Sequence, residues 1–185
     1  MDPFEIQIPV EIVPGLLLGG LRKMQAILDW KPDVLVPLER VPGYIWKEGF
    51  RGEIVYYPII DYGTLPDDVL ERLVEEVVTR LHAGKRTAVF CVGGHGRTGY
   101  VAACVLYRLG IEDPIAFLRK KYSRFAVESS EQELAVERFI EAAKQKREPG
   151  VGQWQSHRER GNGNVHTESE GPPWRTGDRE DRTLC

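Results

Sequence analysis

The sequence predicts an α/β protein with a mostly parallel central sheet and helices on both faces. Short apolar runs rich in β-branched residues alternate with longer segments whose apolar residues recur at three- and four-residue spacing. Alternating strands and helices are typical of parallel sheets that are covered on both sides. A glycine-rich segment, FCVGGHGRTGY at residues 90–100, joins one such strand to one such helix. Turns of this kind bind anions with backbone N–H groups and a helix N-terminus.

In the first half of the chain, strands are expected at EIQIPVEIV and LLLGG, with Pro14-Gly15 turning between them. A short amphipathic helix at LRKMQAILDW follows, and DVLVPLE and EIVYYPII are further strands. The segment DDVLERLVEEVVTRLHAG is a helix because its apolar residues recur at helical spacing. We expect Asp67 or Asp68 to cap its start and Gly84 to end it.

In the second half, RTAVFCV is a β-rich strand that leads directly into the glycine-rich segment. RTGYVAACVLYRLG continues as a helix that is apolar nearly all round over residues 100–107, which predicts a central, buried helix. A further helix begins at Pro114 in PIAFLRKKY. A capping box at residues 130–133, SEQE, is expected to open the last helix, ELAVERFIEAAKQ.

The composition changes near residue 146, which predicts one domain over residues 1–145 and a tail over 146–185. The tail is rich in Gly, Pro, Ser and charge and lacks any apolar period, so we expect it to be disordered. The net charge of -3 gives no attraction to nucleic acid or to an anionic membrane. No apolar run approaches the length that spans a bilayer, and the acidic, proline-broken start is unlike a secretory signal.

The cysteines are three and scattered, which argues against both a disulfide framework and a zinc site; they are Cys91, Cys104 and Cys185. We therefore expect a cytoplasmic, monomeric protein that uses no metal and no cofactor. Cys104 lies inside the predicted buried helix and is expected to be a small core residue, whereas Cys91 lies in the glycine-rich segment. A lone cysteine in such a loop is a candidate nucleophile.

The glycine-rich segment fits two phosphate-binding templates. Its glycines at 94, 96 and 99 spell G-x-G-x-x-G, the dinucleotide fingerprint, while Cys91 and Arg97 spell C-x5-R. The dinucleotide template requires a second strand after the helix, with an acidic residue about 20 residues on. A further helix follows here instead, and no Lys-Ser or Lys-Thr pair follows the glycines to make a Walker-type loop. The cysteine–arginine template is therefore favoured.

That template gives each residue a chemical task. Cys91, as a thiolate at a helix N-terminus, can attack phosphorus and form a phosphocysteine. Arg97 can hold two phosphoryl oxygens at once with its planar guanidinium. Thr98 can donate a hydrogen bond to the sulfur and ease its departure. The backbone that wraps the phosphate is expected to be that of Val92, Gly93, Gly94, His95 and Gly96.

The stretch VFCVGGHGRTG resembles the signature loop, C-x-x-G-x-x-R-[ST]-G, of the cysteine-dependent protein tyrosine phosphatases. The wider chain is similar to their compact dual-specificity branch: VPGLLLGG resembles the early strand, YYPIIDYGTLPDD the general-acid loop, and RFAVESSEQELAVERF the segment after the signature helices. The resemblance covers about residues 8–142. It implies a phosphotyrosine protein phosphatase-like fold and a dual-specificity phosphatase-like catalytic domain over residues 1–145.

The sequence departs from the family pattern at two places. Phe90 stands where the family usually has the histidine that helps set the environment of the thiolate. The later segment has Arg124-Phe125-Ala126 where Arg-Pro-Gly is common.

The resemblance also implies further roles. Asp61 would be the general acid, because it lies in the loop that matches the family's general-acid loop; the aspartates at 67 and 68 are better explained as helix caps. Gln132 would position the hydrolytic water, with a solvent-facing first-turn residue as the alternative. His95 occupies a position where related enzymes that act on multiply phosphorylated lipids often carry Lys, and we expect it to face solvent.

Together these observations predict a phosphomonoester hydrolase that acts on phosphorylated proteins, at tyrosine and at serine or threonine, through a phosphocysteine. The alternatives are a phosphoinositide phosphatase or an RNA 5′-triphosphatase on the same fold, and a non-catalytic phosphopeptide-binding module. Nucleic acid and membranes are not expected as partners.

Overall fold

The structure, a computed structural model, describes residues 8–40 and 50–147 of the 185-residue chain. Its sheet has the strand order β1-β2-β5-β3-β4. The strands are β1 (Val10–Val13), β2 (Leu16–Gly20), β3 (Val34–Pro37), β4 (Glu53–Ile54) and β5 (Thr87–Cys91). β1 pairs with β2 in the antiparallel sense, and the other pairs are parallel. The predicted mostly parallel sheet is confirmed.

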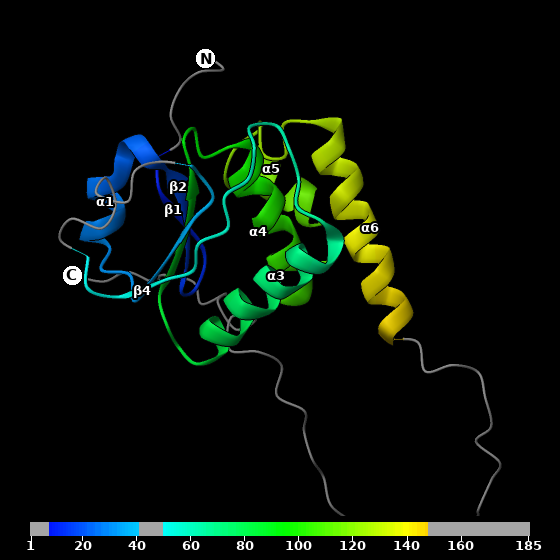
Figure 1. Cartoon of the computed structure of the whole chain (residues 1–185), viewed down its shortest axis with the longest axis horizontal. Helices are drawn as coiled ribbons and strands as arrows, with labels where there is room; N and C mark the ends of the chain where they lie inside the picture. Colours follow the sequence, from blue (N-terminus) through cyan, green and yellow to red (C-terminus); the bar gives the residue numbers. More distant parts are fainter. Residues whose placement is uncertain (1–7, 41–49, 148–185) are drawn as a thin grey trace, which may run out of the picture. The chain divides into compact units, whose positions relative to one another are not determined.

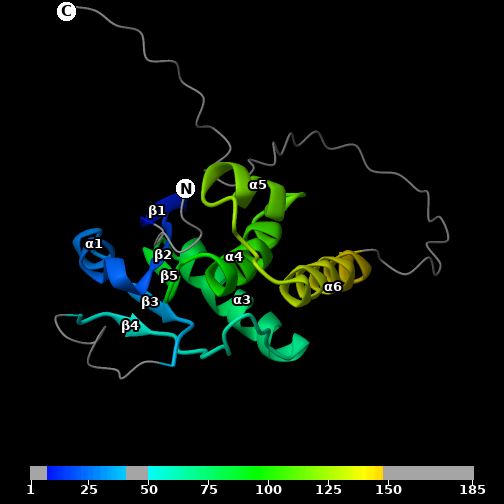
Figure 2. The same ribbon diagram turned by 90° about the horizontal axis from the view of Figure 1, so that it is seen from above.

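Helices cover both faces of this sheet, as predicted. A 3-10 turn, η1 (Leu21–Lys23), and α1 (Met24–Asp29) lie on one side, and α3 (Asp67–His82) and α4 (Gly96–Arg108) lie on the other, as Figure 1 and Figure 2 both show. α5 (Pro114–Lys121) and α6 (Ser130–Arg147) pack outside α4. Among the described residues no helix combines the length and the apolar character that crossing a bilayer requires.

The core has a part on each side of the sheet. On the α1 side, buried side chains from the strands and from α1 form a cluster of Leu17, Met24, Ile27, Leu35, Ala88 and Phe90. On the other side α4 is buried almost throughout residues 100–107, as its sequence predicted. Each fully buried Val, Leu, Ile, Phe or Met side chain contributes roughly 1.5–3 kcal/mol to the free energy of folding. The core therefore fixes α4, and with it the segment that joins β5 to α4.

The strand predicted over EIVYYPII is regular only at β4. Beyond Ile54 the segment follows β3 through isolated hydrogen bonds, from the Val55 N–H to the Leu35 carbonyl and from the Ile59 N–H to the Leu38 carbonyl, both within 3.1 Å. Pro37, the last residue of β3, has no N–H to donate to this segment, which interrupts a regular ladder at this edge of the sheet. Residues 59–61 of this segment nevertheless lie at the carboxyl ends of β3 and β5.

Helix α3 begins differently from the prediction. Its N-cap is Pro66, and neither Asp67 nor Asp68 caps it with a side-chain hydrogen bond. The two aspartates lie in the first turn, where their negative charge is favourable because of the helix dipole. The end of the helix is as predicted: Gly84 has a φ of 75°, and its N–H bonds to the Leu81 carbonyl at 2.9 Å.

Helix α6 begins with a capping box one residue earlier than predicted. The Ser129 hydroxyl accepts the Gln132 N–H at 3.2 Å, and the Gln132 side-chain oxygen accepts the Ser129 N–H at 3.5 Å. The sequence contains two overlapping patterns of this kind, and burial of Gln132 favours the earlier one. The helix extends to Arg147, two residues past the predicted domain end, and the rest of the predicted tail lies outside the described residues.

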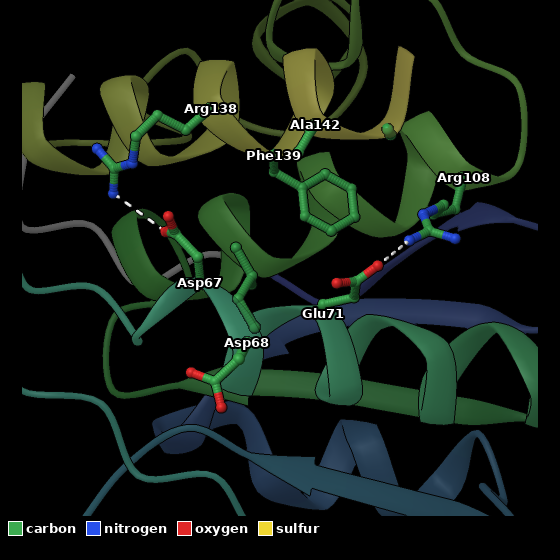
Figure 3. A pocket seen from close by; sticks show the side chains of 9 residues that line it. Asp67, Asp68, Glu71, Arg108, Arg138, Phe139 and Ala142 are labelled. Atoms are coloured by element: carbon green, nitrogen blue, oxygen red, sulfur yellow. Dashed lines mark hydrogen bonds and ion pairs between the residues drawn. The ribbon is translucent and has the colours of Figure 1, made fainter. Parts of the chain in front are cut away.

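A hollow lies where α3, α4 and α6 meet, and Figure 3 shows its lining. Arg138 of α6 pairs with Asp67 of α3 at 3.3 Å, and Arg108 of α4 pairs with Glu71 of α3 at 3.0 Å. The Arg108 guanidinium also lies over the Phe139 ring, 5.4 Å from its centre. These charged pairs tie three helices together around an apolar floor.

Candidate active site

The phosphate loop, residues 91–97, lies at the carboxyl end of β5 in the middle of the sheet. β5 ends at Cys91, His95 is the N-cap of α4, and the helix begins at Gly96. The parallel neighbours of β5 are β2 and β3. In open α/β sheets ligands bind outside this edge, and here the first N–H groups of α4 point at it. The topology therefore places Cys91 and a helix N-terminus together.

The loop curls back so that its own backbone faces the sulfur. The Gly94 N–H donates to the Cys91 Sγ at 3.3 Å. Gly94 has a φ of 86°, and a Cβ on it would come within 2.8 Å of the Gly19 carbonyl carbon on β2. Only glycine satisfies both conditions. The Gly94 carbonyl accepts the Tyr122 hydroxyl, whose pKa is raised well above its ordinary value by burial and by the neighbouring Cys91.

Arg97 lies at the centre of the site and is only 6% exposed. Its guanidinium reaches Glu39 at 2.6 Å and Asp61 at 3.0 Å, and it donates to the Ile59 carbonyl at 3.2 Å. The contact with Glu39 is an ion pair without hydrogen-bond alignment. Glu39 comes just after β3, and residues 59–61 come after β4. Segments that follow three different strands therefore meet at one arginine.

Asp61 is exposed to solvent, since 67% of its side chain is accessible. It contributes to the lining of an open pocket together with Glu39, Arg40, Ile59, Ile60, Val92 and Arg97. The two rival aspartates lie elsewhere: Asp67 pairs with Arg138 and Asp68 with Arg72. The structure thus brings Asp61, and neither rival, to the arginine of the phosphate loop.

Glu39 is the residue of this site that the sequence analysis did not identify. It is largely buried beside Arg97. A signal was available in the sequence, because Glu39 follows the buried strand DVLVP almost directly, and the carboxyl ends of parallel strands share one edge of a sheet.

Thr98 is fully buried, and its hydroxyl donates to the Gly19 carbonyl at 3.5 Å. The hydroxyl thus links α4 to the end of β2 in this structure. Its predicted hydrogen bond to the Cys91 sulfur stays a prediction for the later state in which the sulfur leaves phosphorus.

The expectation that His95 faces solvent is wrong. His95 is only 7% exposed, its Nδ1 lies 2.8 Å from the Ser123 hydroxyl, and Phe125 packs edge-on against the imidazole at 5.9 Å. The segment between α5 and α6 folds over the phosphate loop, and Arg119 supports it by donating to the Ala126 carbonyl at 3.2 Å. The spacing of residues within the phosphate loop does not indicate that the segment between α5 and α6 buries His95.

The solvent-facing alternative for Gln132 is also wrong, because this side chain is fully buried. Its Oε1 accepts the Glu128 N–H at 3.1 Å, and its Nε2 donates to the Gly63 carbonyl at 3.2 Å. Both ends of the amide therefore contact backbone. Positioning of a hydrolytic water by Gln132 stays a prediction.

Two further residues bear on the departures from the family pattern. Phe90 is fully buried in the cluster on the α1 side, so its side chain points away from the face that carries Cys91. Cys104 is fully buried in α4, and burial raises the pKa of its thiol, as expected for a neutral core residue. Within residues 8–40 and 50–147, no group of three or more His, Cys, Asp or Glu side chains is placed to hold a metal ion.

Comparison with known sequences agrees with this geometry. Residues 46–149 match the family model described as PTP-SAK, Swiss Army Knife protein, DSP-PTPase phosphatase domain. Two uncharacterized proteins of Methanocaldococcus jannaschii, MJECL20 and MJ0215, are each 37% identical to the chain, over 86 and 90 residues. The matches cover 46% and 49% of this chain and 58% and 57% of those proteins, so the chain spans little more than half the length of these relatives.

Solved structures share the fold. The active form of Tk-PTP is 23% identical with a TM-score of 0.62, and the match covers 76% of this chain and 99% of that one. Human DUSP28 is 18% identical with a TM-score of 0.64, covering 75% and 99%. The kinase associated phosphatase with its catalytic cysteine replaced by serine is 20% identical with a TM-score of 0.61, covering 78% and 98%. The chain belongs to the DSP-PTPase domain family, within the compact dual-specificity branch of the cysteine-based tyrosine phosphatases.

Proposed function

We propose that this protein hydrolyses phosphomonoesters on phosphorylated proteins, at tyrosine and at serine or threonine, through a phosphocysteine intermediate. The observation that carries the proposal is the meeting of Cys91, Arg97 and Asp61 at one edge of the sheet, with the sulfur facing a helix N-terminus. We further propose that it acts as a cytoplasmic monomer.

In the first step the substrate's phosphoryl group binds the N–H groups of the phosphate loop and takes the place of the Asp61 carboxylate at Arg97. Glu39 keeps its contact with the other nitrogen of the guanidinium, so the orientation of the Arg97 side chain is maintained. The Cys91 thiolate attacks phosphorus, and the S–P bond forms as the P–O ester bond breaks. Asp61, protonated in the substrate complex, donates its proton to the departing oxygen.

In the second step water attacks the phosphocysteine. The Asp61 carboxylate accepts a proton from that water, a new P–O bond forms, and the S–P bond breaks to return the thiolate and release inorganic phosphate. The Thr98 hydroxyl, which donates to the Gly19 carbonyl in this structure, would then donate to the departing sulfur. All of these groups belong to the chain, so the reaction is expected to need no metal and no cofactor.

The contacts of His95 weigh against a lipid substrate. Its ring is buried and contacts Ser123, so it is not available to bind a second phosphate on a phosphoinositide. An RNA 5′-triphosphatase and a non-catalytic binding module are the remaining alternatives, and a panel of substrates distinguishes them.

The test is hydrolysis by the full chain, with a metal chelator present, of phosphotyrosine and phosphoserine peptides, phosphoinositides and triphosphate-capped RNA. Peptide hydrolysis that orthovanadate inhibits is the expected result. Cys91→Ser should abolish turnover and retain peptide binding, whereas Cys104→Ala should stay active as a matched control. Turnover by Cys91→Ser would overturn the assignment of the nucleophile, and peptide binding without any turnover would identify a binding module.

A further inference from the structure

We propose that Ser129 and Gln132 are positioning residues that hold the general-acid loop in place from the start of α6. This inference rests on the proposed role of Asp61 as the general acid. The acid loop is defined here as residues 60–66, between the segment that follows β4 and the start of α3. No contact of Ser129 or Gln132 with the substrate is required.

The two side chains reach consecutive carbonyls of the acid loop. The Ser129 hydroxyl donates to the Tyr62 carbonyl at 2.8 Å, and the Gln132 Nε2 donates to the Gly63 carbonyl at 3.2 Å. The same Ser129 hydroxyl accepts the Gln132 N–H, and the Gln132 Oε1 accepts the Ser129 N–H, which together form the capping box of α6. Each residue therefore links the backbone of α6 to the residues directly after Asp61.

The backbone of the acid loop needs such support. Tyr62 has a φ of 58°, in the left-handed region that residues other than glycine rarely adopt. The turn around it is closed by the Gly63 N–H, which donates to the Ile60 carbonyl at 2.8 Å. This strained turn directs the carbonyls of Tyr62 and Gly63 toward α6, and contacts elsewhere must offset its cost.

Side-chain packing supplies little of that support. The side chains at the tip of the acid loop are mostly exposed: Ile60, Asp61 and Tyr62. The contact between Asp61 and Arg97 must break when a phosphoryl group occupies the arginine. From that moment the hydrogen bonds from α6 hold the residues directly after Asp61, while the Leu65 N–H, which donates to the Tyr100 hydroxyl at 3.4 Å, holds the far end of the loop. A displacement of about 1 Å in a reacting group can reduce a rate about a hundredfold.

This role differs in its kinetic signature from the positioning of a hydrolytic water. The ratio kcat/KM reports steps up to the formation of the phosphocysteine, where Asp61 protonates the leaving group. Loss of the contacts from α6 should lower kcat/KM for a poor leaving group and spare an activated one. Loss of a water-positioning group should instead lower kcat equally for all substrates, because the phosphocysteine is common to them, and should leave kcat/KM unchanged.

The experiment compares a phosphotyrosine peptide with a fluorinated coumarin phosphate. For Ser129→Ala and Gln132→Ala we expect kcat/KM to fall at least about tenfold on the peptide and to change less than about twofold on the coumarin ester. Ser130→Ala, at the exposed first residue of α6, is the matched control and should behave as the wild type. Ser129→Thr keeps the hydroxyl and should restore most of the peptide activity. Melting temperatures of all variants report the loss of the helix cap separately.

The outcomes distinguish a failure of this inference from a failure of the proposed function. Equal losses of kcat/KM on both substrates would show a merely structural role and overturn the inference alone. A lower kcat with unchanged kcat/KM for Gln132→Ala would assign it to the water and likewise overturn its part in the inference. Absence of turnover by the wild-type chain on either substrate would overturn the proposed function, and with it this inference.

Discussion

The pocket at Arg97 and the hollow between α3, α4 and α6 are both lined by arginines and carboxylates, yet they differ in how the charges are held. Arg97 is 6% exposed, and the carboxylates beside it come from segments that follow two different strands. In the hollow, the side chain of Arg138 is 54% exposed, and its partner comes from a neighbouring helix face (Figure 3).

The burial of the arginine is the physical difference between the two places. Exposed ion pairs on helix surfaces contribute about 0–1 kcal/mol each, and their partners can be exchanged. A buried arginine costs much more to desolvate, and the carboxylates of Glu39 and Asp61 both lie beside it here. One of these, Asp61, is exposed and can yield its place to an anion. In the proposed mechanism the Cys91 thiol supplies the nucleophile, and no cysteine is among the residues that line the hollow.

The largest contrast is expected between the two arginines. Arg97→Lys should lower kcat/KM on a phosphotyrosine peptide by roughly 10²–10³, because a point charge cannot reproduce the two-point contact with the phosphoryl group. Arg108→Lys, in the hollow, should leave kcat/KM within about twofold and lower the melting temperature by a few degrees at most. Steady-state kinetics and thermal melts on both variants check this. Near-normal activity of Arg97→Lys would remove the arginine from the mechanism.

The next contrast is between two aspartates. Asp61→Asn should lose about 10²-fold or more on a phosphotyrosine peptide and much less on a fluorinated coumarin phosphate, because only the poor leaving group needs a proton. Asp67→Asn, which weakens the pair with Arg138, should cause a small loss that is equal on both substrates. The ratio of kcat/KM values on the two substrates is the measurement. If Asp67→Asn shows the dependence on the leaving group, the acid has been assigned to the wrong residue.

A smaller effect is expected when a carboxylate is neutralised. Glu39→Gln should lower kcat/KM about tenfold, because the fork of Arg97 loses the charge that orients it. Glu71→Gln, beside Arg108, is the matched substitution in the hollow and should leave the kinetics unchanged. Both variants are compared on the same peptide. Equal kinetics for the two would show that the charge of Glu39 does not orient Arg97 for the reaction.

The smallest contrast concerns two buried tyrosines. Burial raises the pKa of Tyr100, near the hollow, and of Tyr122, near the phosphate loop. The folded state therefore holds these protons more tightly than the unfolded chain, whose tyrosines titrate near 10.0. Their contribution to stability should be complete below that pH and decline as the pH rises above it.

Urea unfolding of the wild type and of the two Tyr→Phe variants, followed from about pH 8 to about pH 11, measures this decline. Each variant should show a shallower decline than the wild type. A wild-type stability that does not fall above pH 10 would contradict the burial of both hydroxyls.

The sequence was sufficient to predict those features that depend on local pattern. Helical spacing gave α3 and α4, and the cysteine–arginine spacing gave the phosphate loop with Cys91 and Arg97 in place. The sequence also singled out Asp61, which the structure places beside Arg97, because its loop follows an apolar strand and resembles a known loop; its role as general acid stays a prediction. These features depend on residues that lie close together in the chain.

Features that depend on distant segments could not be predicted in the same way. The burial of His95 and Gln132 follows from the chain between α5 and α6 folding over the phosphate loop, and no periodicity encodes that fold. The capping box was misplaced by one residue because two overlapping patterns fit equally well. Glu39 was missed because its partner lies 58 residues away in the chain, at Arg97, and only the strand order brings them together.

The proposed mechanism is tested by detection of the phosphocysteine. The wild-type chain is mixed with nitrophenyl phosphate, quenched with acid during turnover, digested and examined by mass spectrometry. A phosphoryl group on the peptide that contains Cys91, absent in Cys91→Ser, is the predicted result. Steady turnover with the phosphoryl group on another residue, or a Cys91→Ser variant that turns over at the wild-type rate, would contradict the account.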